Sequence, residues 1–270
     1  MLHRFSRTEL LVGSEGLKKL QDSCVAIFGL GGVGSYTAEA LARASVGKLV
    51  LVDYDLVCLT NVNRQLHAMI GTIGKPKVEV MAERIKKINP KVVIETHQLF
   101  YSAKVSDELL CAEYDYVVDA IDNVTAKLHL IASAHARGLN VISAMGAANK
   151  LDPTAVRIAD ISETHTCALA RDVRKELRKK YGIEQGVQTV FSVEKPNCID
   201  EEVAADETKC ICPPQKMQGV NDCEVKSQIN GTVSYMPAMF GLMMGGRVVQ
   251  DLLAGEPKKR AAEVFVEAGV

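Results

Sequence analysis

One segment near the start of the chain restricts the fold more than any other. A short apolar run, Cys24 to Phe28, leads directly into the glycine-rich sequence from Gly29 to Gly34, and an alanine-rich helical pattern follows over Ser35 to Ser45. A strand, a glycine loop and a helix in this order begin a βαβ unit. The next apolar run, Lys48 to Asp53, predicts the second, parallel strand of that unit.

The alternation of strands and helices continues along the chain. Further parallel strands are expected at 92–97, 116–121 and 140–144, and helices at 75–88, 104–110 and 124–137. After Gly146, polar alternation predicts antiparallel strands at 155–161 and 188–194, on either side of a charged helix at 166–181. The predicted fold class is α/β and Rossmann-like: a mostly parallel sheet flanked by helices, with a smaller antiparallel C-terminal portion.

The composition is that of a globular protein. The chain has 270 residues, of which 47% are apolar, and a formal net charge of −1. These values exclude a disordered or collagen-like chain and argue against a protein that coats nucleic acid through its overall field. No apolar run approaches the ~20 residues of a membrane helix, and no signal peptide is recognisable, so a cytoplasmic location without a transmembrane segment is expected.

The glycine loop predicts a nucleotide site. Backbone N–H groups around Gly29, Gly31, Gly32 and Gly34 can approach phosphate oxygens, and the N-terminus of the following helix adds partial positive charge. Asp53, at the end of the next strand, can accept hydrogen bonds from ribose hydroxyls. A nicotinamide-dependent oxidoreductase would need little more, so the choice of nucleotide depends on the residues beyond Asp53.

Charged side chains beyond Asp53 favour a triphosphate and its metal. Arg64 and Lys77 can supply cations for the β- and γ-phosphates, and Asp122 can supply a carboxylate for Mg²⁺. We expect the three at the carboxyl ends of parallel strands, where ligands bind in open α/β sheets. A site for a nucleoside triphosphate is therefore favoured over a dinucleotide site, and the base of that nucleotide stays open at this point.

These motifs together resemble those of the ubiquitin-activating-enzyme-like superfamily of adenylating enzymes. The resemblance is carried by the glycine loop 29–34, Asp53-x-Asp55-x-Val57, Asn61-x-x-Arg64-Gln65, Lys77 and Asp119-x-x-Asp122-Asn123. Within the superfamily, the chain is most similar to the tRNA threonylcarbamoyladenosine dehydratases, through the runs 4–7, 11–13, 77–85, 118–122 and 173–178. The resemblance implies one domain over 1–270, with an ATP-binding part at 1–150 and a C-terminal part at 151–270.

The resemblance also implies a reaction. A carboxylate attacks the α-phosphorus of ATP, giving an acyl-adenylate and pyrophosphate, and a nitrogen of the same tRNA nucleoside then displaces AMP and closes a ring. Arg64, Lys77 and Asp122 would be catalytic, with Asp122 orienting Mg²⁺. The implied nucleotide-binding residues are Gly29, Gly31, Gly32, Gly34, Asp53, Asp55, Asn61, Arg64, Gln65, Lys77, Asp122 and Asn123.

Partners follow from the same resemblance. Similar enzymes form homodimers. The expected substrate partner is tRNA bearing threonylcarbamoyladenosine, and a sulfur-relay or carrier protein is a further candidate partner. A monovalent cation is a candidate cofactor. Arg171, Arg174, Lys175 and Arg178 recur at helical spacing and are the candidate tRNA contacts, against the alternative of a merely solvated face. The run 258–260, Lys-Lys-Arg, is a second candidate, for which a frayed polar tail is the favoured interpretation.

Four of the eight cysteines lie in 195–228, a segment without periodicity: Cys198, Cys210, Cys212 and Cys223. They could be unliganded or redox-active thiols, zinc ligands, or include a thioester cysteine. The paired Cys-x-x-Cys spacing typical of sulfur-carrier adenylyltransferases is absent. That weakens, without removing, the alternative function of activating the C-terminal Gly-Gly of a small carrier protein. His67, close to the Arg64-Gln65 pair, is interpreted as a structural histidine.

Overall fold

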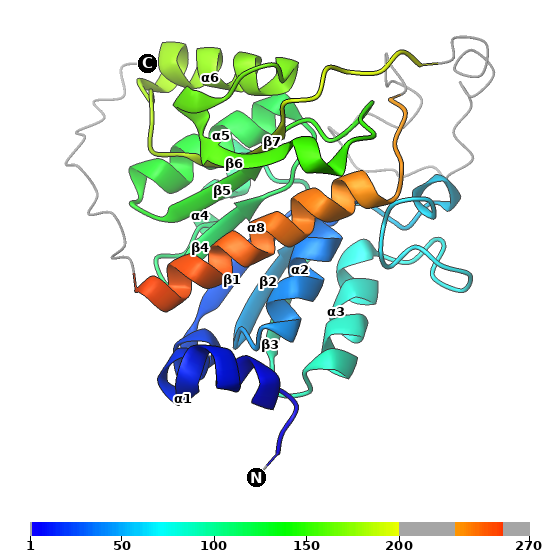
Figure 1. Ribbon diagram of the computed structural model, residues 1–270, viewed down its shortest axis with the longest axis vertical. Helices are drawn as coiled ribbons and strands as arrows, with labels where there is room; N and C mark the ends of the chain where they lie inside the picture. Colours follow the sequence, from blue (N-terminus) through cyan, green and yellow to red (C-terminus); the bar gives the residue numbers. More distant parts are fainter. Residues whose placement is uncertain (1, 200–229, 256–270) are drawn as a thin grey trace.

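A seven-stranded sheet runs through the computed structural model, which describes residues 2–199 and 230–255 (Figure 1). Its spatial order is β3-β2-β1-β4-β5-β7-β6. All neighbouring strands pair in parallel except β6, which is antiparallel to β7. The strands are β1 Cys24–Phe28, β2 Lys48–Val52, β3 Val93–His97, β4 Tyr116–Asp119, β5 Asn140–Ala144, β6 Val156–Asp160 and β7 Gln188–Ser192.

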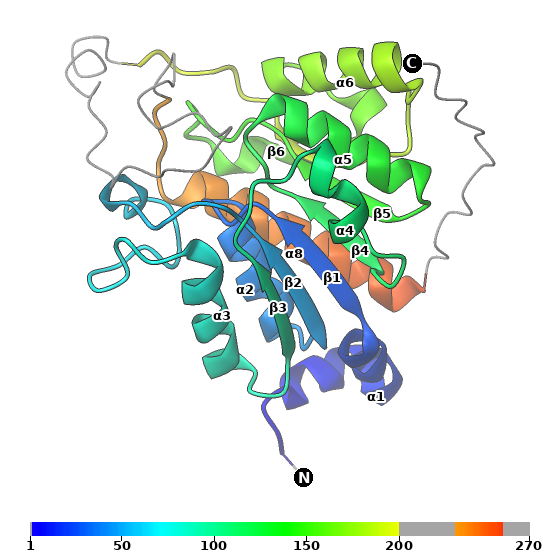
Figure 2. The ribbon, with the colours of Figure 1, turned by 180° about the vertical axis from the view of Figure 1, so that it is seen from behind.

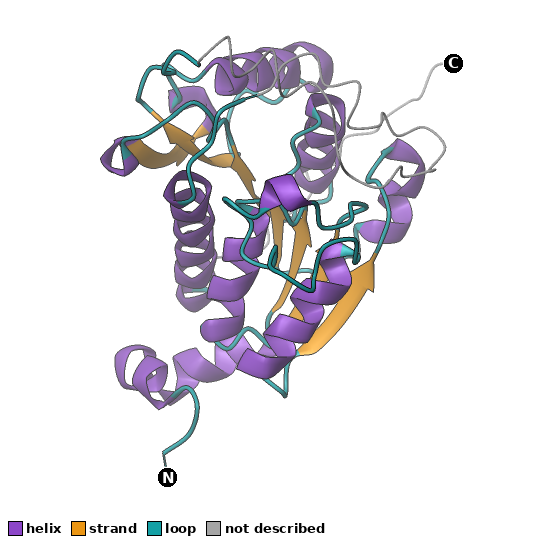
Figure 3. Ribbon diagram, turned by 90° about the vertical axis from the view of Figure 1, so that its right-hand side faces the viewer, coloured by secondary structure: helices purple, strands orange, loops and turns teal. Residues whose placement is uncertain are grey.

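Helices cover both faces of the sheet (Figures 1 and 2). The helices α2 (Gly34–Arg43), α3 (Lys77–Ile88) and α8 (Tyr235–Ala254) pack on one face, and α4 (Ser106–Leu109), α5 (Val124–Ala136) and α6 (Ala168–Tyr181) on the other. Short 3₁₀ turns occur at Leu59–Asn61, Ala103–Val105, Pro153–Ala155 and Ile161–Glu163. Figure 3 shows the strands lying between these helices. The predicted layered α/β fold is confirmed.

Two apolar clusters fill the space between the layers. Ile27, Leu41 and Phe240 represent the cluster under α2, α3 and α8, while Phe28, Leu130 and Leu177 represent the cluster under α5 and α6. Successive residues of β1 point into different clusters, and all five of them are buried. The strand is therefore apolar at every position, as expected for a central parallel strand.

The last two strands differ from the prediction. The sequence predicts antiparallel pairing for both, but β7 pairs in parallel with β5, for example Ser143 with Thr189, and only β6 is antiparallel. The chain leaves β5, forms the edge strand β6, crosses the sheet through α6 and returns as β7 between them. The antiparallel portion is thus one edge strand of the same sheet.

The helix α8 packs closely on α2 through glycine. A Cβ atom on Gly241 would lie 2.3 Å from the carbonyl oxygen of Val33, and one on Gly245 would lie 2.7 Å from the Cβ of Ala40. Thr37 Oγ1 also donates to the carbonyl of Gly241 over 3.1 Å. Of the two roles that such a glycine-rich helix can have, core or subunit interface, Gly241 and Gly245 have the core role.

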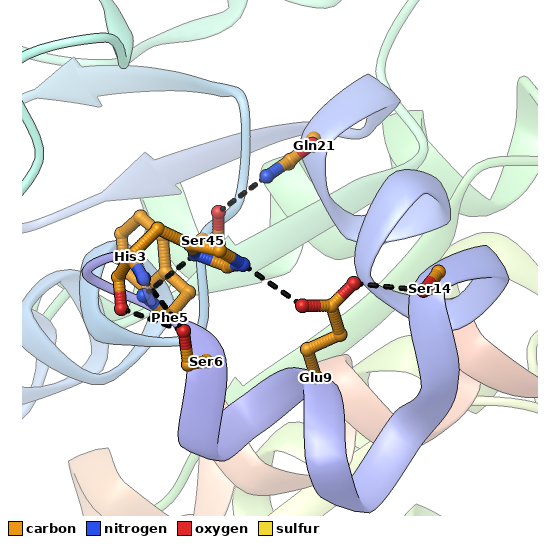
Figure 4. Close-up of polar contacts among 7 residues, drawn as sticks. All are labelled: His3, Phe5, Ser6, Glu9, Ser14, Gln21 and Ser45. Atoms are coloured by element: carbon orange, nitrogen blue, oxygen red, sulfur yellow. Dashed lines mark hydrogen bonds and ion pairs between the residues drawn. The ribbon is translucent and has the colours of Figure 1, made fainter. Parts of the chain in front are cut away.

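The helix α1 (Ser6–Asp22) is not predicted from the sequence. Gly13 has φ 75° and ψ 167°, so two helical pieces meet at a kink. Figure 4 shows polar contacts that hold the kinked shape: the Glu9 carboxylate accepts from Ser14 Oγ across the kink over 2.7 Å and lies 2.8 Å from His3 Nε2. Further along, Gln21 Nε2 donates to Ser45 Oγ over 3.4 Å. Within the described residues, none of the helices is long and apolar enough to cross a membrane.

Candidate active site

The candidate site lies at the carboxyl edge of the sheet, where β1 separates β2 from β4. The chain runs from β1 to β2 on one side, and β4 lies on the other side of β1. Connections leave in opposite directions at such a switch point and open a crevice for ligands. The glycine loop follows β1, Asp53 follows β2, and Asp122 follows β4, so the predicted residues meet at this edge.

Close backbone approaches explain the glycines of the loop. Gly29 has φ 89°, and a Cβ atom there would lie 2.6 Å from the carbonyl oxygen of Ala120. A Cβ atom on Gly34 would lie 1.8 Å from the carbonyl oxygen of Gly29. At Gly32 a Cβ atom would lie 2.9 Å from Pro237 at the start of α8. Only glycine lets the loop fold back this tightly between β4 and α8.

Asp53 ties the glycine loop to the end of β2. Its Oδ2 accepts from the backbone N–H of Leu30 over 2.5 Å, and its Oδ1 accepts from the backbone N–H of Asp55 over 2.8 Å. The side chain is 8% exposed. Each carboxylate oxygen keeps a second lone pair, which leaves acceptor capacity for a hydroxyl group.

Lys77 is a buried cation at the same edge. The residue is 4% exposed, and its Nζ donates to Asp55 Oδ2 over 2.6 Å. Burial acts to lower the pKa of Lys77, but the carboxylates of Asp53, Asp55 and Asp122 outweigh burial and raise the pKa above its usual value. Lys77 is therefore held protonated, and its charge is shared among three carboxylates.

The segment between β2 and α3 brings two more predicted residues to the site. Asn61 is buried, and its Oδ1 accepts from the backbone N–H of Cys58 over 3.0 Å. Gln65 is 7% exposed, and its Nε2 lies 3.9 Å from the place of a Cβ atom on Gly31. Its Oε1 is buried without a hydrogen-bond partner among the described residues. Gln65 thus faces the glycine loop with an unused acceptor.

The charges of Arg64 and Asp122 interact. Burial lowers the pKa of Arg64, and the Asp122 carboxylate acts in the opposite direction. Arg64 Nη1 donates to the carbonyl of Thr60 over 2.8 Å and to Asn63 Oδ1 over 3.0 Å. Asp122 is exposed on the loop between β4 and α5. The Asp122 carboxylate thus lies within electrostatic range of both Arg64 and Lys77, and the Arg64 Cγ lies 3.4 Å from the place of a Cβ atom on Gly32 in the glycine loop.

Asn123 has a structural partner. Its Oδ1 accepts from the backbone N–H of Ala126 over 3.0 Å, so it caps the N-terminus of α5. This bond occupies one of the two lone pairs of the side-chain oxygen. Capping of α5 therefore explains an asparagine at position 123 without a bound ligand.

The donor set suits a metal that is carried mainly by phosphate. Within residues 2–199 and 230–255 there is no group of three or more histidine, cysteine or acidic side chains that could hold a metal ion. Mg²⁺ does not need such a group, because it is usually bound by one or two carboxylates together with substrate phosphates and water. The exposed carboxylate of Asp122 beside two cations fits that arrangement.

One of the four candidate zinc ligands lies among the described residues. Cys198 is exposed and has a free thiol, whereas Cys210, Cys212 and Cys223 lie outside the described residues, as does the basic run 258–260.

The candidate tRNA helix, α6, has one inward-facing member. Arg174 is half-buried, and its Nη1 donates to the carbonyl of Thr164 over 2.7 Å and to Thr164 Oγ1 over 2.5 Å. It therefore anchors α6 to the preceding turn rather than lying on the predicted outer face. Arg171, Lys175 and Arg178 are exposed. Arg171 and Arg178 form surface ion pairs with Asp172 and Glu184, each at 3.0 Å.

One buried charge beside the site is not predicted from the sequence. Lys127, on α5, is 1% exposed and lies 2.7 Å from the carboxylate of Asp119 at the end of β4. The sequence contains a sign of this buried charge, because Lys127 is the only lysine in an otherwise mostly apolar helix. Lysine is almost never fully buried unless it is paired.

Comparison with known proteins agrees with this arrangement. The chain matches the ThiF family over residues 5–268. It is 46% identical over 267 residues to the tRNA threonylcarbamoyladenosine dehydratase of Bacillus subtilis, covering 97% of this chain and 100% of that protein. The crystal structure of the Escherichia coli tRNA N6-threonylcarbamoyladenosine dehydratase TcdA in complex with ATP superposes with a TM-score of 0.79 at 31% identity, covering 93% of this chain and 94% of that one.

A more distant relative shares only part of the chain. The molybdopterin-synthase adenylyltransferase of E. coli is 38% identical over 152 residues, which is 55% of this chain and 59% of that protein. The family match, in contrast, spans nearly the whole sequence, and the B. subtilis dehydratase is matched over its full length. The chain belongs to the ThiF family.

Proposed function

We propose that this protein is an ATP-dependent enzyme that dehydrates threonylcarbamoyladenosine in tRNA to a cyclic form. The observation that carries the proposal is the meeting of the glycine loop with Arg64, Lys77 and Asp122 at one edge of the sheet. Similarity over the full length to an enzyme with this name supports the choice of substrate.

The proposed reaction has two steps. A threonyl carboxylate oxygen of the nucleoside forms a bond to the α-phosphorus of ATP, and the bond from that phosphorus to the β-phosphate oxygen breaks, releasing pyrophosphate. A nitrogen of the same nucleoside then forms a bond to the carbonyl carbon and gives its proton to solvent, while the bond from that carbon to the former carboxylate oxygen breaks and AMP leaves with this oxygen. The second step needs no enzymic nucleophile, because the attacking nitrogen is already held at high effective concentration.

The protein's part in these steps is electrostatic. Backbone N–H groups of the glycine loop and the start of α2 bind phosphate oxygens. Lys77 and Arg64 bring positive charge to the edge where negative charge moves onto pyrophosphate. Asp122, together with the triphosphate, would hold Mg²⁺, and the ion supplies charge neutralisation on the phosphates. Asp53 has acceptor capacity left for the ribose.

The proposal extends to partners and location. Lys175 and Arg178, exposed on α6, are proposed to contact tRNA phosphates, and Arg171 lies one turn before Lys175 on the same helix. The protein is proposed to act as a homodimer in the cytoplasm, and sedimentation of the purified protein tests the dimer.

The decisive experiment compares two tRNA preparations. AMP release is measured with tRNA that carries threonylcarbamoyladenosine and with the same tRNA lacking the modification, and the product nucleoside is identified by mass. The proposal expects AMP release and a nucleoside lighter by one water with the modified tRNA only. Equal, negligible AMP release from both would refute it. Stimulation of AMP release by a carrier protein ending in Gly-Gly would instead favour the alternative adenylyltransferase function.

A further inference from the structure

A fully enclosed ion pair lies beneath the loop that carries Asp122. Lys127 and Asp119 are 1% and 0% exposed, and Lys127 Nζ donates to Asp119 Oδ2 over 2.7 Å. The same ammonium group donates to Ser143 Oγ over 3.3 Å and to the carbonyl of Ala144 over 3.0 Å. Ser143 Oγ in turn donates to Asp119 Oδ2 over 2.6 Å. The three protons of the ammonium group therefore each have an acceptor.

Stability alone is a weak reason for such a pair. Removing two charges from water costs free energy that their attraction often fails to recover, and well-packed apolar residues in the same space are frequently as stable or more so. A buried ion pair does, however, fix the relative positions of the elements that contribute to it, because its geometry allows few alternatives. Here it joins the ends of β4 and β5 to the first turns of α5.

The other oxygen of Asp119 reaches into the Asp122 loop. Asp119 Oδ1 accepts from the backbone N–H of Ile121 over 3.1 Å, on the residue directly before Asp122. After Asp122, the Asn123 carbonyl accepts from the backbone N–H of Lys127 over 2.9 Å. The loop is thus held before Asp122 by the Asp119 carboxylate of the ion pair, and after Asp122 by the first backbone hydrogen bond of α5, the helix that carries Lys127.

The same network also supports the glycine loop. The backbone N–H of Ala120 donates to the carbonyl of Phe28 over 2.8 Å, and the Ala120 carbonyl occupies the place that a Cβ atom of Gly29 would need. A shift of Asp119 would therefore move the Asp122 loop and the phosphate-binding loop together.

We infer that Lys127, acting through Asp119, is a positioning residue that fixes the Asp122 carboxylate opposite Arg64 and Lys77. The inference rests on the proposed function, because the position of Asp122 matters only if Asp122 helps to bind Mg²⁺ and the triphosphate. Lys127 is enclosed in the core and acts on the reaction only through the loop, so it is not a catalytic residue. The ligand toward which it orients Asp122 is the Mg²⁺–triphosphate group.

The test begins with the full-length protein without ligand. Lys127→Met removes the ammonium group, and Lys127→Arg keeps a cation. Amide hydrogen exchange is measured at Ile121 and across 120–123. The inference expects exchange at Ile121 to be roughly 10-fold faster in Lys127→Met, since Asp119, left with Ser143 but without the ammonium group, holds that amide less firmly. Lys127→Arg should return the rate toward that of the wild type.

The second readout is the dependence of AMP release on Mg²⁺. We expect Lys127→Met to lower kcat roughly 10- to 100-fold and to raise the half-saturating Mg²⁺ concentration, as for other residues that orient a metal-binding group. The KM for tRNA should change less than about 2-fold, because the proposed phosphate contacts to tRNA are Lys175 and Arg178 on α6. Lys150→Met is the matched control: Lys150 is also a buried lysine, 4% exposed, and its Nζ donates to the carbonyl of Glu194, a residue outside the Asp119–Lys127 network. It should leave the Mg²⁺ dependence unchanged.

A double variant in which both members of the pair are neutral is the control for loss of folding. If Lys127→Met alone does not fold, the double variant Lys127→Met with Asp119→Asn contains no uncompensated buried charge and should fold, while showing the same defects. A folded variant with wild-type exchange at Ile121 and wild-type Mg²⁺ dependence would overturn the inference. Asp122→Asn is measured in parallel: if it keeps full activity, the proposed role of Asp122 fails, whereas the exchange data still judge the Lys127 network on their own.

Discussion

Among single residues, Lys77 has a charge that its surroundings fix strongly. Its Nζ lies 2.6 Å from Asp55 Oδ2, and Asp53 and Asp122 also act on it. Because this cation is protonated and already positioned before substrate binds, it can stabilise developing negative charge without rearrangement.

We therefore predict that Lys77→Met lowers kcat for AMP release by roughly 10²- to 10³-fold, the range for loss of one group that stabilises transition-state charge. The variant also leaves three carboxylates near one another without a buried cation, so a lower Tm is expected. Lys77→Arg is the control, because it restores charge but changes its geometry, and it should recover Tm more than kcat. A Lys77→Met protein with near-normal kcat would contradict the assigned role.

His67 is a second buried residue with an unusual environment. It is 0% exposed, and neither ring nitrogen has a hydrogen-bond partner among the residues that the structure describes. Burial, together with the positive charges of Lys77 and Arg84, lowers the pKa of His67 to about 4. The ring is neutral in the folded protein at neutral pH.

This pKa predicts how stability depends on pH. In the unfolded chain His67 has its ordinary pKa of 6.5, so between pH 6.5 and 4 the unfolded state binds more protons than the folded state. Its contribution to the free energy of unfolding therefore falls as the pH falls through this window, by up to about 3 kcal/mol. His67→Phe should reduce that slope in urea unfolding at pH 5 and pH 7. An identical slope in the variant would show that His67 is not the group responsible.

The place in the fold of most candidate site residues could be predicted from the sequence, but the side chains that they contact could not. The glycines, Arg64, Lys77 and Asp122 belong to motifs whose spacing is local. The pairing of Lys77 with Asp55, and of Lys127 with Asp119, depends on how the chain folds between them. Asn123 shows the opposite limit, because asparagine before a helix is as typical of an N-cap as of a ligand.

At the level of elements, the packing of α8 against α2 controls the shape of the glycine loop. Gly241 packs against the Val33 carbonyl and Pro237 packs against Gly32, and neither glycine has room for a Cβ atom. Both contacts are made with the segment that follows β1. A shift of α8 would be transmitted directly to the phosphate-binding backbone.

This contact can be tested with two glycines of one helix. A Cβ atom on Gly241 meets the Val33 carbonyl at 2.3 Å, whereas one on Gly246 meets nothing within 4 Å. Gly241→Ala should destabilise the protein by about 1–3 kcal/mol through overpacking. Gly246→Ala, the control, should stabilise it by about 0.5–1 kcal/mol, because alanine loses less conformational freedom in a helix. Urea unfolding measures both, and equal effects would refute the tight contact.

Element type was more predictable than strand direction or a kinked helix. The strands β1 and β5 have the predicted bounds, because apolar runs between turn residues mark them well. The direction of β7 depends on the path through β6 and α6, which no local pattern records. The helix α1 is kinked at Gly13 and leaves Leu10 and Leu11 87% exposed, so its sequence lacks the single apolar stripe by which helices are identified.

At the scale of the whole molecule, a formal net charge of −1 conceals an uneven distribution of charge. The helix α6 carries six basic and two acidic residues between Arg171 and Lys180, and it lies at the opposite end of the molecule from α1 (Figure 1). Arg171 pairs with Asp172 and Arg178 pairs with Glu184, and both ion pairs are exposed. Exposed ion pairs contribute so little free energy that phosphate contacts can replace them. An overall charge near zero is therefore compatible with the proposed binding of tRNA through α6.

The charge distribution leads to a prediction about salt. Lys175→Ala combined with Arg178→Ala should weaken tRNA binding and make the plot of log Kd against log salt shallower by about 1 for each phosphate that the protein no longer neutralises. The KM for ATP should not change, because the proposed nucleotide site lies at the carboxyl edge of β1, β2 and β4. Lys18→Ala, at an exposed position on α1, is the matched control and should leave the salt dependence intact. Arg174→Ala should instead lower Tm, because its guanidinium is bonded to Thr164 inside the protein. If the double variant kept the wild-type salt dependence, α6 would not be the tRNA surface, and its charge would serve only to keep that end of the molecule hydrated.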